Sequence, residues 1–218
     1  MGIETAYAYN AKGDYWNNFY SKEKSPKVPS QFAVFVASEY PECSVFVDIG
    51  CGNGRDSFFF ASQGKSVVSV DGSESAVTLI DAVNEGRFDI KALCSSVDAP
   101  HLSSEIVKRL PEVDGLAILY ARFFLHAINE EEEDAFLAAC IDVMKKAGNA
   151  VLAVEFRTTR DRGLQKETRT HYRRYIDPVD FIQKVNTRGL SVKYFVEGFG
   201  YAKYKSDDAH VARLVLSL

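Results

Sequence analysis

Several features of membrane, secreted and modular proteins are missing from this sequence of 218 residues. No apolar run approaches the roughly 20 residues that a membrane-spanning helix needs. Residues 1–10 lack the basic start and apolar core of a secretory signal, and no internal repeat or low-complexity linker divides the chain. These absences predict a single cytoplasmic domain without a membrane partner.

Cysteine is scarce, and strong net charge is absent. Cys43, Cys51, Cys94 and Cys140 form no C-x-x-C pair, so we expect reduced cysteines in or beside the core and no metal site. The formal net charge is -4, which argues against bulk binding of nucleic acid. What is present, 46% hydrophobic and 26% charged residues, is typical of a soluble globular protein.

The stretch 45–56, VFVDIGCGNGRD, is the most informative in the chain. Apolar, β-favouring residues lead to Asp48, glycines then occupy positions 50, 52 and 54, and a helical pattern begins at Ser57. This order indicates strand, tight turn and helix. Glycines let the backbone approach a ligand closely, and amides at a helix start can face electron-rich groups. We expect a nucleotide-like ligand, the alternative being a turn that serves only the course of the chain.

The glycine spacing narrows the choice of ligand. A dinucleotide fingerprint, G-x-G-x-x-G, would need glycine at position 55 or 57, where Arg55 and Ser57 stand. Asp48 followed by G-x-G-x-G resembles motif I of the class I S-adenosylmethionine (SAM) dependent methyltransferases. A second acid, Asp71, ends the strand-like run 66–70, where that family places the carboxylate that binds both ribose hydroxyls. A carboxylate can accept two hydrogen bonds at once.

The resemblance implies an α/β fold of three layers, with a doubly wound, seven-stranded, mostly parallel sheet whose last strand is antiparallel. We predict strands at 45–48, 66–70, 88–94, 115–120, 149–156, 190–197 and 210–218. Helices are predicted at 31–39, from 57, at 73–84, from 101, at 129–146 and at 177–188. The likeness covers residues 31–218 and leaves residues 1–30 as an N-terminal aromatic segment.

That aromatic segment holds Tyr15 and the only tryptophan, Trp16. In many SAM methyltransferases an N-terminal element folds over cofactor and substrate, so by resemblance the two side chains form a lid. Aromatic faces attract cations, which suits a sulfonium. The alternative is that these aromatics only cover the sheet edge.

Cofactor contacts are implied residue by residue from the family pattern. Asp98 follows the third strand, where the family places a polar side chain near the adenine amino group; alternatively it caps the helix that starts near His101. The residues expected to bind SAM are Asp48, Gly50, Cys51, Gly52, Asn53, Gly54, Asp71, Gly72, Ser73, Asp98, Tyr120 and Trp16.

The end of the fourth strand supplies the catalytic candidates, because in this family it faces the transferred methyl group. These candidates are Tyr120, Arg122 and His126. The ligand crevice of such sheets lies at the carboxyl ends of the strands. His126 could act as a base on a substrate hydroxyl; it could equally pack under the adenine or fill a helix start.

A basic stretch follows the fifth strand. Residues 157–174 hold seven basic and two acidic residues, a balance of +5. Guanidinium groups bind phosphate or carboxylate bidentately, so an anionic substrate is predicted, with the alternative of a solvated loop whose arginines pair with acids elsewhere. The predicted substrate-binding residues are Tyr15, Arg157, His171, Arg173 and Arg174.

The predicted function is methyl transfer to an oxygen of a small anionic acceptor, such as a phosphorylated or acidic saccharide or metabolite. EFR at 155–157 and HYRR at 171–174 resemble small bacterial methyltransferases of surface-polysaccharide clusters, which implies polysaccharide biosynthesis. The alternatives are a small-molecule enzyme of the thiopurine or tellurite type, an RNA methyltransferase, and a non-enzymatic module that binds SAM or NAD. YARF at 120–123 stands in place of an N-P-P-Y-like tetrapeptide, which disfavours amino-group methylation of bases. We expect a monomer or homodimer.

Overall fold

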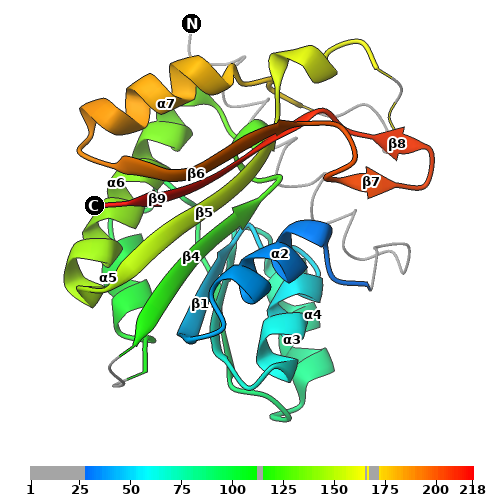
Figure 1. The fold of residues 1–218 in the computed structure, drawn as a ribbon. Helices are drawn as coiled ribbons and strands as arrows, with labels where there is room; N and C mark the ends of the chain where they lie inside the picture. The colour runs from blue at the N-terminus through cyan, green and yellow to red at the C-terminus, as the bar shows by residue number, and fades with distance from the viewer. Residues whose placement is uncertain (1–27, 112–114, 165, 167–171) are drawn as a thin grey trace, which may run out of the picture.

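The computed structural model describes residues 28–111, 115–164, 166 and 172–218, which form one α/β unit (Figure 1). Tyr15, Trp16 and His171 lie outside these residues. The elements are α2 (Gln31–Glu39), β1 (Cys43–Ile49), α3 (Arg55–Ser62), β2 (Ser66–Asp71), α4 (Glu74–Asn84), β3 (Ile90–Cys94), α5 (Leu102–Val107), β4 (Leu116–Arg122), η1 (Leu125–Ala127), α6 (Glu130–Ala147), β5 (Ala150–Arg157), η2 (Thr159–Asp161), α7 (Pro178–Thr187), β6 (Ser191–Gly198), β7 (Lys203–Tyr204), β8 (Asp207–Asp208) and β9 (Val211–Ser217).

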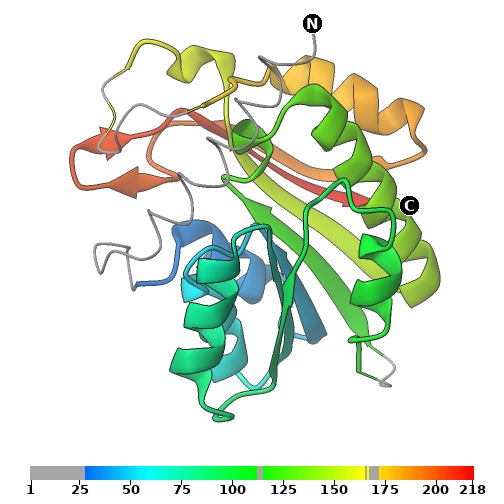
Figure 2. The ribbon, with the colours of Figure 1, turned by 180° about the vertical axis from the view of Figure 1, so that it is seen from behind.

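Seven strands form one sheet in the order β3-β2-β1-β4-β5-β9-β6. The first five are parallel, and β9 is antiparallel to both β5 and β6. Figures 1 and 2 show α2, α3 and α4 on one face and α5, α6 and α7 on the other. The predicted three-layer, doubly wound fold with an antiparallel last strand is confirmed. Strand order reverses between β1 and β4, and ligands of such sheets bind at the carboxyl ends of the strands there.

Alternate residues of β4 contribute to two cores. Leu119 and Ala121 belong to the cluster shared with α5, α6 and α7, whereas Ile118 and Tyr120 belong to the cluster shared with α2 and α3. Side chains alternate along a strand, so Arg122 lies on the same face as Tyr120. A charged residue therefore ends β4 on the face that α2 and α3 cover.

Capping groups stand at three of the predicted helix starts. Asn129 and Glu132 form a capping box, in which each side chain accepts a hydrogen bond from the other residue's backbone amide, at the start of α6. Asp177 caps α7, whose first residue is Pro178. The Ser73 side chain accepts a hydrogen bond from Ala76 N at the start of α4. These three predicted starts are confirmed.

The connection from β6 to β9 holds a hairpin that the sequence analysis missed. Its strands β7 and β8 have two residues each and pair antiparallel. Lys203 N donates a hydrogen bond to the Gln31 side chain over 3.0 Å, which ties the hairpin to α2. None of the described helices combines the length and apolar character of a membrane span.

Candidate functional site

The glycine turn between β1 and α3 is folded tightly against its surroundings. Gly50 and Cys51 both donate from their backbone amides to Val70 O at the end of β2, over 2.8 and 3.1 Å. Gly50 and Gly54 have φ angles of 74° and 73°, in the left-handed region that favours glycine. A Cβ at Gly50 would lie 2.4 Å from Phe124 Cδ2, so a side chain there would both strain the backbone and collide.

Asp71 ends β2 beside this turn. Gly52 N donates to Asp71 Oδ2 over 2.9 Å and Ser73 N donates to Asp71 Oδ1 over 2.8 Å. Burial raises the pKa of this carboxyl, and the backbone donors oppose that shift. Each carboxylate oxygen has about two acceptor positions, so the oriented carboxylate keeps capacity for further donors. That arrangement fits the two ribose hydroxyls of SAM.

Asp48 lies beneath the turn, away from solvent. Ser57 Oγ donates to Asp48 Oδ2 over 2.6 Å, and Ser69 Oγ donates in turn to Ser57 Oγ over 2.9 Å. Burial, followed by the neighbouring Asp56, raises the pKa of Asp48 to about 8. The Cys51 thiol is also buried, and burial raises its pKa. Burial therefore favours the uncharged forms of both groups beside the turn.

The other predicted cofactor residues surround the ends of β2 and β3. Gly72 and Ser73 follow Asp71 directly, and Asn53 is part of the glycine turn. Asp71 pairs with Cys94 across the two strands, which brings the exposed Asp98 to the same edge of the sheet. Asp98 accepts a hydrogen bond from Ser96 Oγ. The N-cap residue of α5 is His101, so the alternative that Asp98 caps this helix is wrong.

Tyr120 is part of the core, which argues against its predicted catalytic and cofactor-binding roles. Its side chain is 0% exposed, and its ring packs against Phe32 and Phe60 with centroids 5.2 Å away in each case. The hydroxyl lies 2.9 Å from Asp56 Oδ2 and 3.0 Å from Ser30 Oγ. Burial raises its pKa well above the usual value. The structure thus directs Tyr120 into the layer between sheet and helices.

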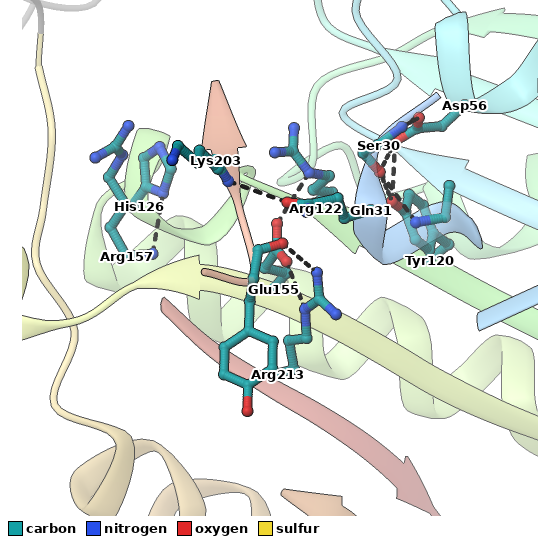
Figure 3. A network of polar contacts seen from close by, with 12 residues as sticks. Ser30, Gln31, Asp56, Tyr120, Arg122, His126, Glu155, Arg157, Lys203 and Arg213 are labelled. Carbon is teal, nitrogen blue, oxygen red and sulfur yellow. Dashed lines mark hydrogen bonds and ion pairs between the residues drawn. The ribbon is translucent and has the colours of Figure 1, made fainter. Parts of the chain in front are cut away.

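Arg122 begins a charged row across three neighbouring strands. In register, Arg122 of β4 lies beside Glu155 of β5, and Glu155 lies beside Arg213 of β9. Arg122 Nε is 2.9 Å from Glu155 Oε1, and Arg213 Nε donates to Glu155 Oε2 over 2.7 Å. Figure 3 shows the Glu155 carboxylate between the two guanidinium groups. One buried anion therefore faces two cations at the carboxyl edge of β4.

The residue after Arg122 has an unusual backbone. Phe123 has a φ of 55°, which is rare for a bulky side chain and marks local strain. Its ring lies under the guanidinium carbons of Arg122 and Arg157, at 4.1 and 5.2 Å from the centroid. The ring of His126 is 5.0 Å away, and Arg157 N donates to His126 Nδ1 over a long 3.4 Å (Figure 3). The structure thus brings Arg122 and His126 together around this strained turn.

Arg157 is engaged within the protein, which corrects its predicted role in binding substrate. Its guanidinium donates to Asp161 Oδ2 over 2.6 Å and to Asp207 Oδ2 over 2.7 Å. The side chains of Arg157, Asp161 and Asp207 are at most 6% exposed. Asp161 also accepts from His210 N over 3.0 Å. These contacts form a clasp, defined here as Arg157, Asp161 and Asp207, which joins β5, η2 and β8.

The other described cations of the basic stretch are largely paired as well. Arg174 contacts Glu133 and lies 3.9 Å from Glu130, and Arg160 is 2.9 Å from Glu197. This arrangement matches the alternative in which the arginines pair with acids elsewhere, and it argues against Arg174 as a substrate ligand. Arg173 is half-buried beside Arg174.

Sequence reasoning missed a second charged group next to the glycine turn. Asp56, in the first turn of α3, accepts from Ser30 N over 2.7 Å and from Ser30 Oγ over 2.8 Å. Its neighbour Arg55 is mostly buried, and its pKa is lowered by burial and then by Arg122. The signal that could have revealed charged groups around the strand ends is a charged residue inside an apolar strand pattern, such as Glu155 in AVLAVEF.

Comparison with known proteins agrees with this geometry. A family model described as thiopurine S-methyltransferase (TPMT) matches residues 12–176. Comparison with curated protein sequences yields no match.

Many solved structures share the fold. One is a SAM-dependent methyltransferase from Anabaena variabilis, with 20% identity, a TM-score of 0.68 and coverage of 99% of this chain and 95% of that one. Another is the 1,6-didemethyltoxoflavin-N1-methyltransferase of Burkholderia thailandensis, solved with bound 1,6-didemethyltoxoflavin and S-adenosylhomocysteine, with 13% identity, a TM-score of 0.66 and coverage of 99% of this chain and 90% of that one. A TehB-like methyltransferase from Corynebacterium glutamicum has 14% identity, a TM-score of 0.61 and coverage of 98% of each chain.

The family match spans the glycine turn, Asp71 and the end of β4, where the strand order reverses. It confirms the predicted enzyme class, a methyltransferase whose cofactor is SAM. The chain belongs to the thiopurine S-methyltransferase family.

Proposed function

We propose that this enzyme methylates an oxygen of a small anionic acceptor, such as a phosphorylated or acidic saccharide or metabolite. The supporting observation is the charged row at the carboxyl edge of the sheet, where Arg122 and Arg213 face the single carboxylate of Glu155. Guanidinium groups suit phosphate and carboxylate oxygens. Polysaccharide biosynthesis in the cytoplasm, by a monomer or homodimer, is the setting that we propose.

The proposed cofactor contacts come from the family pattern, and the geometry of the turn supports them. The glycine turn and Asn53 would hold the methionine part of SAM, Asp71 the ribose, and Gly72, Ser73 and Asp98 the adenine side. Tyr15 and Trp16 remain proposed lid residues, and His171 and Arg173 remain proposed substrate ligands. Bound SAM supplies a methyl carbon already activated by its sulfonium, so the task of the chain is mainly to align the acceptor.

The hydrogen bonding of His126 bears on the kind of acceptor. With Nδ1 accepting from Arg157 N, the neutral ring carries its proton on Nε2. In that tautomer Nε2 has no lone pair with which to remove a proton from an acceptor oxygen. An oxygen that is already ionised, as in phosphate or carboxylate, needs no base near neutral pH, whereas a sugar hydroxyl would. The geometry therefore favours an ionised acceptor.

A second candidate acceptor is a small sulfur or nitrogen heterocycle. Family membership supports it, as does the fold shared with the toxoflavin methyltransferase. Such a substrate would make no use of the excess positive charge around Glu155, which is why we rank it second.

A methyl-transfer assay separates the two acceptors. Purified protein would be incubated with labelled SAM and matched pairs of compounds: sugar phosphates against the same neutral sugars, and thiopurines against purine carboxylates. We expect transfer to phosphorylated or carboxylated compounds only. Equal transfer to neutral partners, or transfer confined to thiopurines, would contradict the anionic class.

The cofactor assignment has its own test. Asp71→Asn should weaken binding of S-adenosylhomocysteine by about tenfold or more, because charge-assisted hydrogen bonds to the ribose are lost. Calorimetry measures the dissociation constant. Asp81→Asn, a change of an exposed acid on α4, is the matched control and should bind as the wild type does. Unchanged affinity in Asp71→Asn would contradict the role of this carboxylate.

A further inference from the structure

Two arginines lie near the point where strand order reverses. Arg55 is the first residue of α3, directly after the glycine turn, and Arg122 is the last residue of β4. Their side chains are 17% and 15% exposed. Asp56, the residue after Arg55, accepts a hydrogen bond from the Tyr120 hydroxyl over 2.9 Å, and Arg122 follows two residues after Tyr120 on the same face of β4. Because β1 and β4 are paired neighbours, both arginines lie near the carboxyl ends of these two strands, where such sheets bind ligands.

Neither guanidinium is fully satisfied by the residues that the structure describes. Arg122 Nε is buried 2.9 Å from Glu155 Oε1, but the two groups are not aligned as a hydrogen bond. Arg55 Nε lies 3.7 Å from Asp56 Oδ1, and Asp56 already accepts from Ser30 and Tyr120. Within the described residues, the terminal nitrogens of Arg55 and Arg122 have no hydrogen-bond partner. Both side chains keep donors available to a ligand.

The charge balance of this region is also incomplete. Three cations, Arg55, Arg122 and Arg213, are grouped with two anions, Asp56 and Glu155, which leaves three minus two, or +1. An uncompensated charge in a mostly buried setting is unfavourable. Arg213 is fixed by Glu155 and by Tyr201 O at 2.6 Å, so the unmet charge belongs to Arg55 and Arg122. An anion placed against them would restore neutrality.

We propose that Arg55 and Arg122 form a subsite for an oxyanion, the phosphate or carboxylate of the methyl acceptor. The proposal rests on the proposed function and moves anion recognition away from the basic stretch at 157–174. In that stretch Arg157 and Arg174 are already neutralised by acids. The guanidinium groups of α3 and β4 would hold the anion where the strand order reverses, between β1 and β4. The rest of the acceptor would then extend toward β5 and the hairpin of β7 and β8.

Inorganic phosphate is the probe for this subsite. Thermal unfolding of the full chain would be followed with increasing phosphate, against chloride at equal ionic strength, first alone and then with saturating S-adenosylhomocysteine. A ligand that binds only the folded state raises the melting temperature according to its concentration and affinity. The variants are Arg55→Gln and Arg122→Gln. Arg160→Gln, which removes an exposed cation paired with Glu197, is the control.

Both variants should fold. Without Arg122, Glu155 keeps Arg213 as its partner, and without Arg55, Asp56 keeps its three hydrogen-bond donors. We expect phosphate to stabilise the wild type and Arg160→Gln both with and without S-adenosylhomocysteine. In Arg55→Gln and in Arg122→Gln the apparent dissociation constant for phosphate should rise by about tenfold or more.

Two results would overturn the subsite. If both variants respond to phosphate as Arg160→Gln does, these arginines do not bind the anion. If saturating S-adenosylhomocysteine abolishes the phosphate effect in the wild type, and both variants bind this compound at least tenfold more weakly, the anion is the cofactor's own carboxylate. Failure of the proposed function is distinct: phosphate would then bind as expected while no anionic compound accepts a methyl group.

Discussion

At the scale of single residues, burial and hydrogen-bond donors determine the orientation and the pKa of the carboxyl groups near the carboxyl ends of the strands. Asp71 is oriented by two backbone amides, whereas Asp48 has one serine donor in a buried setting, and burial raises its pKa to about 8. Glu155 is fully buried between two guanidinium groups. The three acids therefore differ in setting: Asp71 is the proposed ligand acceptor, Asp48 is a buried group whose pKa is raised, and Glu155 is the counter-ion of two arginines.

The raised pKa of Asp48 predicts a pH dependence of stability. The folded state holds this proton up to about pH 8, whereas the unfolded chain releases it near the ordinary pKa of an aspartate, 3.8. Between these values the folded state binds more protons, so the stabilising contribution is full below pH 3.8 and is lost as pH rises toward 8. The slope is at most about 1.4 kcal/mol per pH unit.

Asp48→Asn removes that titration and keeps an oxygen that can accept from Ser57. Urea unfolding at several pH values between 5 and 8, on the order of one unit apart, measures the difference between the two proteins. We expect the free energy of unfolding of the variant to fall less steeply with pH than that of the wild type. Parallel curves would show that Asp48 is charged in the folded protein.

At the scale of elements, the glycine turn is determined by its backbone and by its neighbours together. Gly50 has both a positive φ and Phe124 in the way of a Cβ. Gly64, at the end of α3, has a φ of 77°, and a Cβ there would meet nothing within 4 Å among the described residues. Substitution at Gly64 therefore tests backbone strain alone, whereas substitution at Gly50 tests backbone strain together with a steric clash.

Gly64→Ala should cost about 1–2 kcal/mol, the strain of a left-handed residue. Gly50→Ala should cost about 1–3 kcal/mol more, because Phe124 must also move, and it should weaken binding of S-adenosylhomocysteine. Urea unfolding and calorimetry measure the two effects. Equal losses of stability in the two variants would mean that the Phe124 side chain can move away at little cost in free energy.

The clasp of Arg157, Asp161 and Asp207 is a buried ionic group that connects elements far apart in the chain. Arg157→Met leaves two buried carboxylates without their common partner and should cost about 3–5 kcal/mol. Arg160→Met breaks an exposed pair, since the Arg160 side chain is 68% exposed, and should cost about 0–1 kcal/mol. Denaturant unfolding compares the two; similar small losses would contradict a stabilising clasp.

Most elements could be predicted from the sequence because their signals are local. Ser73 and Asp177 mark helix starts by capping, the acids after Asn129 mark a third start by their place in the first turn, and apolar runs such as 115–120 mark buried strands. The hairpin of β7 and β8 escaped because its two-residue strands carry no periodicity. The partners of Arg157 and Arg174 escaped because Asp207 and Glu133 lie about 40 to 50 positions away in the chain, and only the fold brings them together.

At the scale of the whole molecule, the distribution of charge matters more than its sum. In the sequence the basic stretch is the feature that would suit RNA, yet three of its described arginines, Arg157, Arg160 and Arg174, contact carboxylates. Arg55 and Arg122, near the carboxyl ends of the strands, are only partly paired. This arrangement favours a small acceptor over a polymer.

We therefore expect weak binding to RNA. Titration of the protein into labelled single-stranded RNA at several salt concentrations should show no tight complex near physiological salt. The apparent affinity should depend little on salt, because few phosphates are neutralised. Tight binding with a steep loss of affinity as salt rises would instead support the RNA methyltransferase alternative.

The position of Glu155 between Arg122 and Arg213 also constrains how this family member can diverge. Loss of Glu155 alone would leave two arginines in the interior without their shared carboxylate. Loss of one arginine would leave one ion pair of opposite charges. Mutational paths that exchange this acid must first pass through loss of an arginine, so the order of steps is limited by epistasis. Altered acceptor preference should thus begin at Arg122, the row member nearest the crevice.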